Sequence, residues 1–136
     1  KVAIIGGGLS GLSCAHQLEK HGIQPVIFER NSFIGDQYGH ISALLGIQHR
    51  PIKDAIEYFK KNFDINITPV NTINNLTHYS PNKKKVLKGN FGYFLKRGRE
   101  KDSLFSQIYS QLKNPVVKFN TLADYEPLSK EFNFVV

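Results

Sequence analysis

The sequence predicts an α/β fold built on a parallel sheet, with a strand-rich insertion between the second and third parallel strands. Two patterns indicate this fold. A short apolar run at residues 2–5 is followed by a helical pattern and a second apolar run at 25–28, the order of a βαβ unit. Short strand-like runs then occupy residues 65–97, before a further helix and strand. A length of 136 residues suits one compact domain, so we expect a single domain over 1–136 that contains the insertion.

The first βαβ unit rests on three local signals. The run at 2–5 is continuously apolar and ends in glycine, as buried parallel strands do. A helix is expected from Leu9 to Lys20, because apolar residues recur along one flank and Gly22 follows as a stop signal. The next strand, at 25–28, leads directly into Glu29. A parallel connection of this kind crosses over right-handed.

The middle of the chain is expected to change from helix to short strands. Residues 31–50 have the composition of a loop, and Pro51 fits the first turn of a helix that continues to Phe63 with apolar residues at helical spacing. Turn residues fill 80–83. Strands are expected around them at 70–79, 86–87 and 93–95.

The last third returns to the helix-and-strand pattern. Asp102 is a candidate N-cap for a helix over 103–112, and 116–119 is expected to form a third parallel strand. Residues 125–130 are expected to connect to a final buried strand at 132–136. No cap, turn or polar tail follows that strand, so we expect a fold that is truncated at its C-terminus.

Composition and charge narrow the class of partner. Hydrophobic residues are 40% and charged residues 21% of the chain, which is ordinary globular usage. The net charge of +7 comes largely from scattered lysines, which indicates a solvated basic surface. We expect a small-molecule substrate and no nucleic acid, because no RNA-binding signature accompanies the basic residues. No apolar run approaches the roughly 20 residues of a transmembrane helix.

Cysteine and histidine usage excludes several kinds of site. Cys14 is the single cysteine, so the chain can form neither an internal disulfide nor a CxxC redox pair. We expect a packed, inert thiol and a reducing, cytoplasmic setting. The five histidines show no metal-ligand spacing, and no metal is expected.

The strongest motif is a glycine-rich turn, in which every residue is a candidate cofactor-binding residue. It follows a strand and opens a helix, the context that supports G-x-G-x-x-G as a dinucleotide-binding turn of Rossmann type. The first glycine permits the tight turn, the second lets a pyrophosphate approach the backbone, and the third lets helix and strand pack closely. Unpaired N–H groups and the helix dipole would favour the phosphates. The turn consists of Gly6, Gly7, Gly8, Leu9, Ser10 and Gly11.

Glu29 is the acidic partner that such a turn requires. It ends the second strand at about the expected spacing from the turn, where its carboxylate can accept hydrogen bonds from ribose hydroxyls. The same charge would repel a 2′-phosphate, which argues against NADP at this site. The neighbouring Arg30 either stacks on adenine or is solvated, and both alternatives stay open.

The first thirty-five residues resemble the amino terminus of FAD-dependent oxidoreductases, through the text VAIIGGGLSGLSCAHQLEKHGIQPVIFERNSFIG. Glu29 and Gly35 match an E-x5-G continuation, although Asp36 stands where those families commonly have a second glycine. Residues 34–42 look like the corresponding loop of geranylgeranyl-reductase-like flavoproteins. That family shares its FAD fold with p-hydroxybenzoate hydroxylase.

The resemblance implies FAD as the cofactor and adds further candidate residues. Residues 93–97, 103–112 and 116–119 are similar in order and length to the family's arginine-bearing strand, helix and returning strand. By that resemblance Arg97 is a candidate contact to a cofactor phosphate or ribose, with a surface arginine as the alternative. His40 lies in the loop after Gly35 and is either a flavin contact or an ordinary loop histidine. Residues 131–136 resemble the strand that leads into the family's Ala-Thr-Gly turn.

These observations predict the FAD-binding amino-terminal portion of a flavin-dependent oxidoreductase. It would transfer hydride or electrons to or from an organic substrate, with NAD(P)H as a candidate partner. No catalytic residue is assigned, and the fragment alone is expected to be inactive. The alternatives are an NAD-binding Rossmann domain of a dehydrogenase and a non-catalytic nucleotide-binding domain. A disulfide reductase is excluded, since it needs a redox-active cysteine pair after Gly35.

Overall fold

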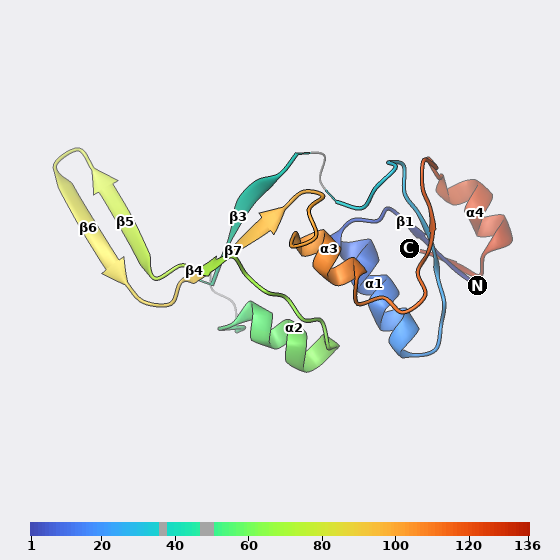
Figure 1. Ribbon diagram of the computed structural model, residues 1–136, viewed down its shortest axis with the longest axis horizontal. Helices are drawn as coiled ribbons and strands as arrows, with labels where there is room; N and C mark the ends of the chain where they lie inside the picture. The colour runs from blue at the N-terminus through green and yellow to red at the C-terminus, as the bar shows by residue number, and fades with distance from the viewer. Residues whose placement is uncertain (36–37, 47–50) are drawn as a thin grey trace.

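A computed structural model describes residues 1–35, 38–46 and 51–136. Its main sheet, which includes the strand labelled β1 in Figure 1, is parallel and has the strand order β8-β2-β1-β9. These strands are β1 (Val2–Ile5), β2 (Val26–Phe28), β8 (Val116–Lys118) and β9 (Phe134–Val135). The parallel pairing of β1 with β2 and of β2 with β8 confirms the α/β fold and the first βαβ unit.

The two faces of this sheet are covered by different helices, because neighbouring strand residues alternate between faces. Ile4 and Ile27 are partners in the register and are each 1% exposed. They belong to a core that also contains buried residues of α1 (Leu9–Lys20) and α3 (Leu104–Tyr109). Ala3 and Phe28 contribute to a second cluster together with Leu128 of α4 (Tyr125–Glu131). The sheet is therefore covered on both sides, as a parallel sheet requires.

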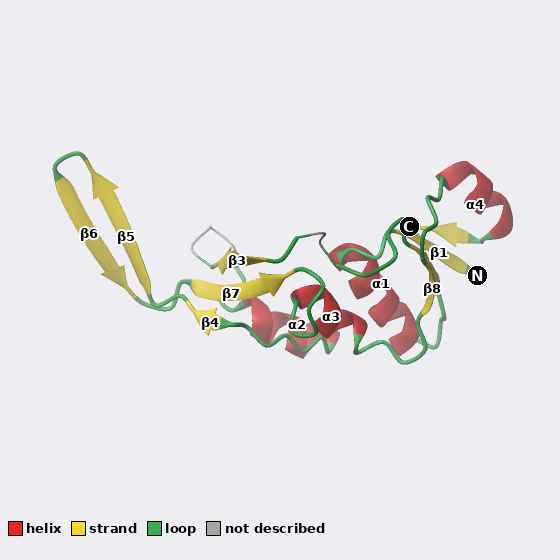
Figure 2. Ribbon diagram, turned by 45° about the horizontal axis from the view of Figure 1, so that its top comes forward, coloured by secondary structure: helices red, strands yellow, loops and turns green. Residues whose placement is uncertain are grey.

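A second, antiparallel sheet lies beside α1 and α3, with the strand order β3-β7-β4 (Figure 2). It consists of β3 (His40–Leu45), β7 (Gly92–Arg97) and β4 (Asn71–Thr72). The helix α2 (Ala55–Phe63) lies between β3 and β4 in the chain and packs Phe59 and Phe63 against the main core. At the opposite end from the parallel sheet, β5 (Asn75–Ser80) and β6 (Lys83–Lys88) form a hairpin that projects from the rest of the chain (Figure 1).

The structure corrects several expected boundaries in the first two thirds of the chain. Part of the expected loop 31–50 is the strand β3, whose register with β7 runs from His40↔Arg97 to Leu45↔Gly92. The helix α2 begins at Ala55, after Pro51, because the Asp54 carboxylate accepts the Glu57 N–H and caps the helix there. The expected strand 70–79 is divided between β4 and β5, which belong to different sheets.

Corrections also apply to the last third. Ser103, and not Asp102, is the N-cap of α3, because the Ser103 side chain accepts the Ser106 N–H while the Asp102 carboxylate pairs with Lys96. The expected connector 125–130 is the helix α4. The final strand is short and is not fully buried, since Phe134 is 69% exposed at the edge of the sheet.

Candidate dinucleotide site

The glycine-rich turn joins β1 to α1 and leaves an open space in front of the helix. Gly6 has a φ of 99°, in the region that favours glycine, and its N–H donates to the Phe28 carbonyl oxygen at 2.8 Å. Gly8 is the N-cap of α1, with extended backbone and no side-chain cap. A Cβ at Gly8 would meet no heavy atom within 4 Å. The first turn of the helix therefore faces space that an anion can enter.

Gly7 and Gly11 are closely packed, in contrast to Gly8. A Cβ at Gly11 would collide with the Gly6 carbonyl oxygen and would lie 3.1 Å from Ile4 Cγ2. A Cβ at Gly7, which is buried, would collide with Ile34 Cδ1. The helix thus begins directly against the strand, the arrangement that the third glycine of the motif was expected to permit.

The Glu29 carboxylate is buried against this turn, with 8% of the residue exposed. Its Oε2 accepts the Gly7 N–H at 2.8 Å, and its Oε1 accepts the Asn31 N–H at 2.8 Å. The two bonds fix the carboxylate between the turn after β1 and the loop after β2. Each oxygen still has a lone pair for a further donor, which is what a ribose diol would supply.

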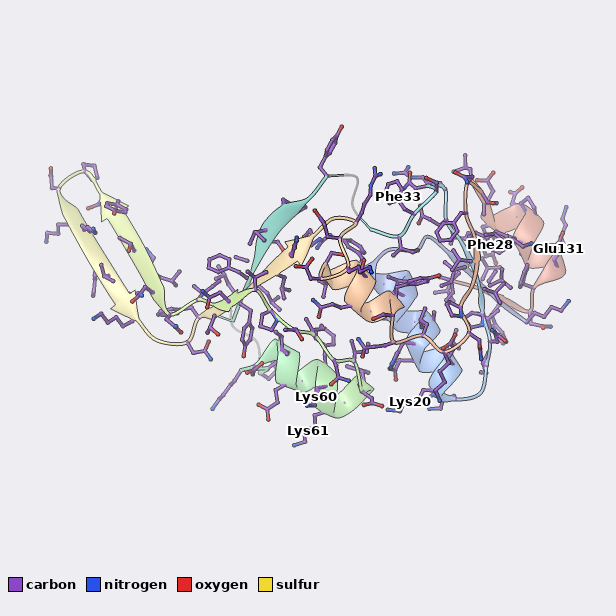
Figure 3. The ribbon with its side chains drawn as sticks, viewed as in Figure 1. Lys20, Phe28, Phe33, Lys60, Lys61 and Glu131 are labelled. Carbon is purple, nitrogen blue, oxygen red and sulfur yellow. The ribbon has the colours of Figure 1, made fainter. Side chains whose placement is uncertain are left out.

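A second pair of loops meets at Gly35, the glycine of the E-x5-G match. Gly35 has a φ of 118°, and a Cβ on it would collide with the Gly98 carbonyl oxygen. Nearby, the Arg99 guanidinium carbon lies 3.5 Å from the ring centroid of Phe33, which Figure 3 labels on the loop after β2. The loop after β2 is therefore held against the turn after β7. Asp36, the departure from the family pattern, lies outside the described residues.

A mainly apolar cavity of about 350 Å³, here called the central cavity, lies beside the amino-terminal half of α1. Its volume falls within the range of small-molecule sites. Arg97 lines it, half-buried, with its guanidinium carbon 4.7 Å from the Phe105 ring centroid. The sequence did not reveal this cavity, because its walls come from five separate elements. Its other lining residues are Leu9, Ser13, Ser42, Ala43, Leu44, Phe59, Ile65, Ile67, Leu95, Leu104 and Ile108.

The remaining candidate residues lie at the surface or pack in the core. Arg30 is exposed beside the buried Glu29. His40 is exposed and is the strand partner of Arg97, which brings both residues to the same end of the second sheet. Cys14 is half-buried and packs against the core. Among the described residues, no group of three or more His, Cys, Asp and Glu could hold a metal ion. No helix in that same part of the chain is long and apolar enough to cross a bilayer.

The turn, the buried acid and the adjoining cavity define a dinucleotide-binding domain of the flavoprotein class. The family model described as FAD dependent oxidoreductase (DAO) matches residues 1–103. The chain belongs to this family, and its cofactor is FAD, not the alternative NAD. The residues present fit that cofactor, because Gly8 leaves room for a phosphate and the central cavity opens beside the same helix.

Several known proteins are similar to this chain. A flavin-containing amine oxidase of Oncorhynchus mykiss is 32% identical over 98 residues, covering 66% of this chain and 19% of that protein. The FAD-dependent monooxygenase BOA8 of Botryotinia fuckeliana is 25% identical over 156 aligned positions, covering 96% of this chain and 20% of its own length. The chain thus spans about a fifth of the length of these relatives.

A solved structure supports the fold independently. The crystal structure of a geranylgeranyl bacteriochlorophyll reductase-like protein from Thermoplasma acidophilum matches with a TM-score of 0.53 at 17% identity. The match covers 88% of this chain and 30% of that one. This likeness confirms the expected resemblance to geranylgeranyl-reductase-like flavoproteins at the level of the fold.

Proposed function

We propose that residues 1–136 bind FAD through the adenosine and pyrophosphate half at the glycine-rich turn and through the flavin half at the central cavity. The observation that carries this proposal is the Glu29 carboxylate, held by the Gly7 and Asn31 amides immediately beside the open space at Gly8. A ribose bound by Glu29 would direct the adjoining phosphates to the start of α1. The rest of the cofactor would extend from there towards Arg97.

Each expected cofactor contact has a defined task in this proposal. Gly8 and the amides of Leu9 and Ser10 would bind the phosphates, and the helix dipole would stabilise their charge. Glu29 would accept the ribose hydroxyls and repel a 2′-phosphate. Arg97, already positioned at the wall of the central cavity, would neutralise a phosphate or donate to a ribose hydroxyl.

The protein's own residues prepare the site rather than carry the reaction. Bound FAD supplies the hydride or electron chemistry through its isoalloxazine ring. Leu44, Leu95 and Leu104 form apolar walls of the central cavity, which exclude water from whatever binds there. We assign no catalytic residue within the described part of the chain. The electron donor proposed for the whole protein is NAD(P)H, and the proposed substrate is a small organic molecule.

The proposal extends to the organisation and setting of the protein. We propose that residues 1–136 form one FAD-binding domain, into which 65–97 is inserted. The lone Cys14 thiol, half-buried in α1, is compatible with a reducing cytoplasmic setting. By analogy with other proteins of this fold, we propose double bonds of polyprenyl or other lipid-like compounds as candidate substrates.

Titration of the purified full-length protein with FAD, NAD and NADP tests the proposal directly. We expect a flavin absorption spectrum, FAD binding and no competition by NADP, and we expect Glu29→Gln to weaken FAD binding. Preference for NAD over FAD would contradict the proposal. Bound FAD that is reduced by no nicotinamide donor, and reoxidised by no organic acceptor, would favour the alternative of a non-catalytic nucleotide-binding domain.

A further inference from the structure

A second pocket, here called the Tyr93 pocket, shares two lining residues with the central cavity. It has a volume of about 170 Å³ and is formed mainly by β3, the start of α2 and β7. Leu44 and Phe59 line both the Tyr93 pocket and the central cavity. A molecule in the Tyr93 pocket would therefore adjoin the central cavity at these two side chains.

The polar centre of the Tyr93 pocket is a short hydrogen bond from one wall to the other. The Tyr93 hydroxyl on β7 donates to Asp54 Oδ2, before α2, at 2.6 Å. The other oxygen of Asp54 accepts the Glu57 N–H at 3.0 Å, which caps the helix. These two hydrogen bonds, with the Glu57 amide as the larger cause, lower the pKa of Asp54 below its ordinary value. The carboxylate therefore stays charged at neutral pH.

This arrangement determines which chemical group the pocket can recognise. The Tyr93 proton is committed to Asp54, so the pair presents lone pairs and no free proton to a ligand. Asn90, which also lines the pocket, has its side-chain oxygen bound by the Gly92 N–H at 3.3 Å. Lys53, which lines the pocket too, is exposed. Most of the remaining lining is apolar, from Leu45, Ile52 and their neighbours.

We infer that the Tyr93 pocket binds the organic substrate, and that this substrate is an apolar molecule whose O–H or N–H group donates to the Tyr93–Asp54 pair. The inference rests on the proposed function, because it takes the neighbouring central cavity as the flavin site. The Tyr93–Asp54 pair would orient the substrate through its donor, while the apolar lining would bind the rest of the molecule. Tyr93 and Asp54 are thus substrate-binding residues of a pocket that shares Leu44 and Phe59 with the proposed flavin site.

Three probes that share a benzene ring test this inference in the full-length protein. Phenol carries a hydroxyl donor, benzylamine carries an ammonium donor, and anisole carries no donor. Affinities are measured by ligand-observed NMR titration. We expect phenol or benzylamine to bind about tenfold or more tightly than anisole, as a hydrogen bond to a charged acceptor would provide. The donor probe that binds more tightly indicates whether a hydroxyl or an ammonium group fits the Tyr93–Asp54 pair better.

Three variants locate the binding. Asp54→Asn removes the charge but keeps a good N-cap, so α2 should stay folded while the affinity for the donor probe falls about tenfold. Ala55→Leu fills the pocket and should block all three probes. Tyr125→Phe removes a hydroxyl from the exposed face of α4 and should change nothing. Circular dichroism of each variant verifies the fold.

The result that would overturn the inference is equal affinity for anisole and the donor probes, no binding of any probe, or binding that survives both Asp54→Asn and Ala55→Leu. FAD titration of the same preparation separates this outcome from a failure of the proposed function. FAD binding without probe binding would refute the substrate pocket alone. Probe binding without FAD binding would refute the proposed function and leave a ligand pocket of another purpose.

Discussion

Alanine substitutions at Gly11 and Gly8 should damage different properties: the first the stability of the fold, the second the affinity for FAD. This contrast is the sharpest test of the proposed site. At Gly11 the new Cβ collides with the Gly6 carbonyl oxygen and lies 3.1 Å from Ile4 Cγ2. A backbone carbonyl cannot rotate away as the end of a flexible side chain can. Overpacking at Gly11 should therefore cost about 3 kcal/mol of folding stability, the upper end of the usual range. Better helix propensity returns about 1 kcal/mol. The net loss of about 2 kcal/mol corresponds to a melting temperature about 8 °C lower for a chain of this size.

At Gly8 the same substitution should leave the fold intact and damage binding. The Cβ meets no protein atom within 4 Å, and the φ of −76° is allowed for alanine. A poorer N-cap and a less flexible unfolded chain nearly cancel, at about 0.5–1 kcal/mol each. A phosphate in front of the helix would, however, meet the added methyl group. We expect FAD affinity to fall on the order of tenfold or more, which is about 1.4 kcal/mol.

Thermal unfolding and FAD titration of the two variants distinguish the two effects. Gly11→Ala should melt early, and Gly8→Ala should melt with the wild-type protein but take up less flavin. Wild-type FAD affinity in Gly8→Ala would show that the pyrophosphate does not lie over residue 8, and the proposed site would be wrong. An unchanged melting temperature in Gly11→Ala would show that the turn relaxes more easily than its packing indicates.

Three further predictions follow from particular hydrogen bonds. Glu29→Gln places an amide NH₂ against one of the two N–H donors, those of Gly7 and Asn31. FAD affinity, measured by titration, should fall tenfold or more, and the free energy of unfolding, measured in urea, should fall by about 1–3 kcal/mol. An unchanged affinity would remove Glu29 from the site. Asp54 has its pKa lowered below the ordinary 3.8, chiefly by the Glu57 amide and then by the Tyr93 hydroxyl. Its contribution is therefore present above about pH 4 and lost as the pH falls through the lowered pKa, so the excess stability of wild type over Asp54→Asn should be larger at pH 7 than at pH 3 in urea unfolding; a constant difference would contradict this. Ser103→Ala removes the cap of α3 from a fully buried position and should cost about 1 kcal/mol in the same assay, whereas wild-type stability would show that water replaces the cap.

Local sequence signals were sufficient for the dinucleotide turn and for the first βαβ unit. Glycine spacing, apolar runs and the acid at the end of β2 all act over a few residues, so they appear in the sequence as they do in the structure. The strand β3 was missed for a different reason. Its ladder partner β7 begins 47 residues after the end of β3, at Gly92 after Leu45, so the pairing that makes it a strand is not local.

Two nearby residues that can each begin a helix explain why the predicted starts of α3 and α2 were wrong. Asp102 and Ser103 are both good N-cap residues, and the sequence does not show that Asp102 pairs with Lys96 at 2.9 Å. Pro51 and Asp54 likewise offer two starts for α2, and the hydrogen bond from Tyr93 on a distant strand adds to the Asp54 cap. Choices between adjacent capping residues depend on tertiary contacts, so the existence of a helix is easier to predict than its first residue.

Sequence patterns also could not predict the two pockets, because residues from several separate elements line each of them. The central cavity nevertheless bears on the choice between FAD and NAD. In the proposed site, the turn and Glu29 would contact groups that both dinucleotides share, so this part of the site would not distinguish them. Discrimination must come from the half of the cofactor that differs, and the structure offers the central cavity for it, with Arg97 and the apolar side chains of β3, β7 and α3 as walls. Those walls are assembled partly by the strand-rich residues after β2, which connect to the dinucleotide-binding unit at the close contact of Gly35 with Gly98. The E-x5-G glycine thus has a physical reason: any side chain at residue 35 would push the cavity wall away from the turn that we propose binds the phosphates.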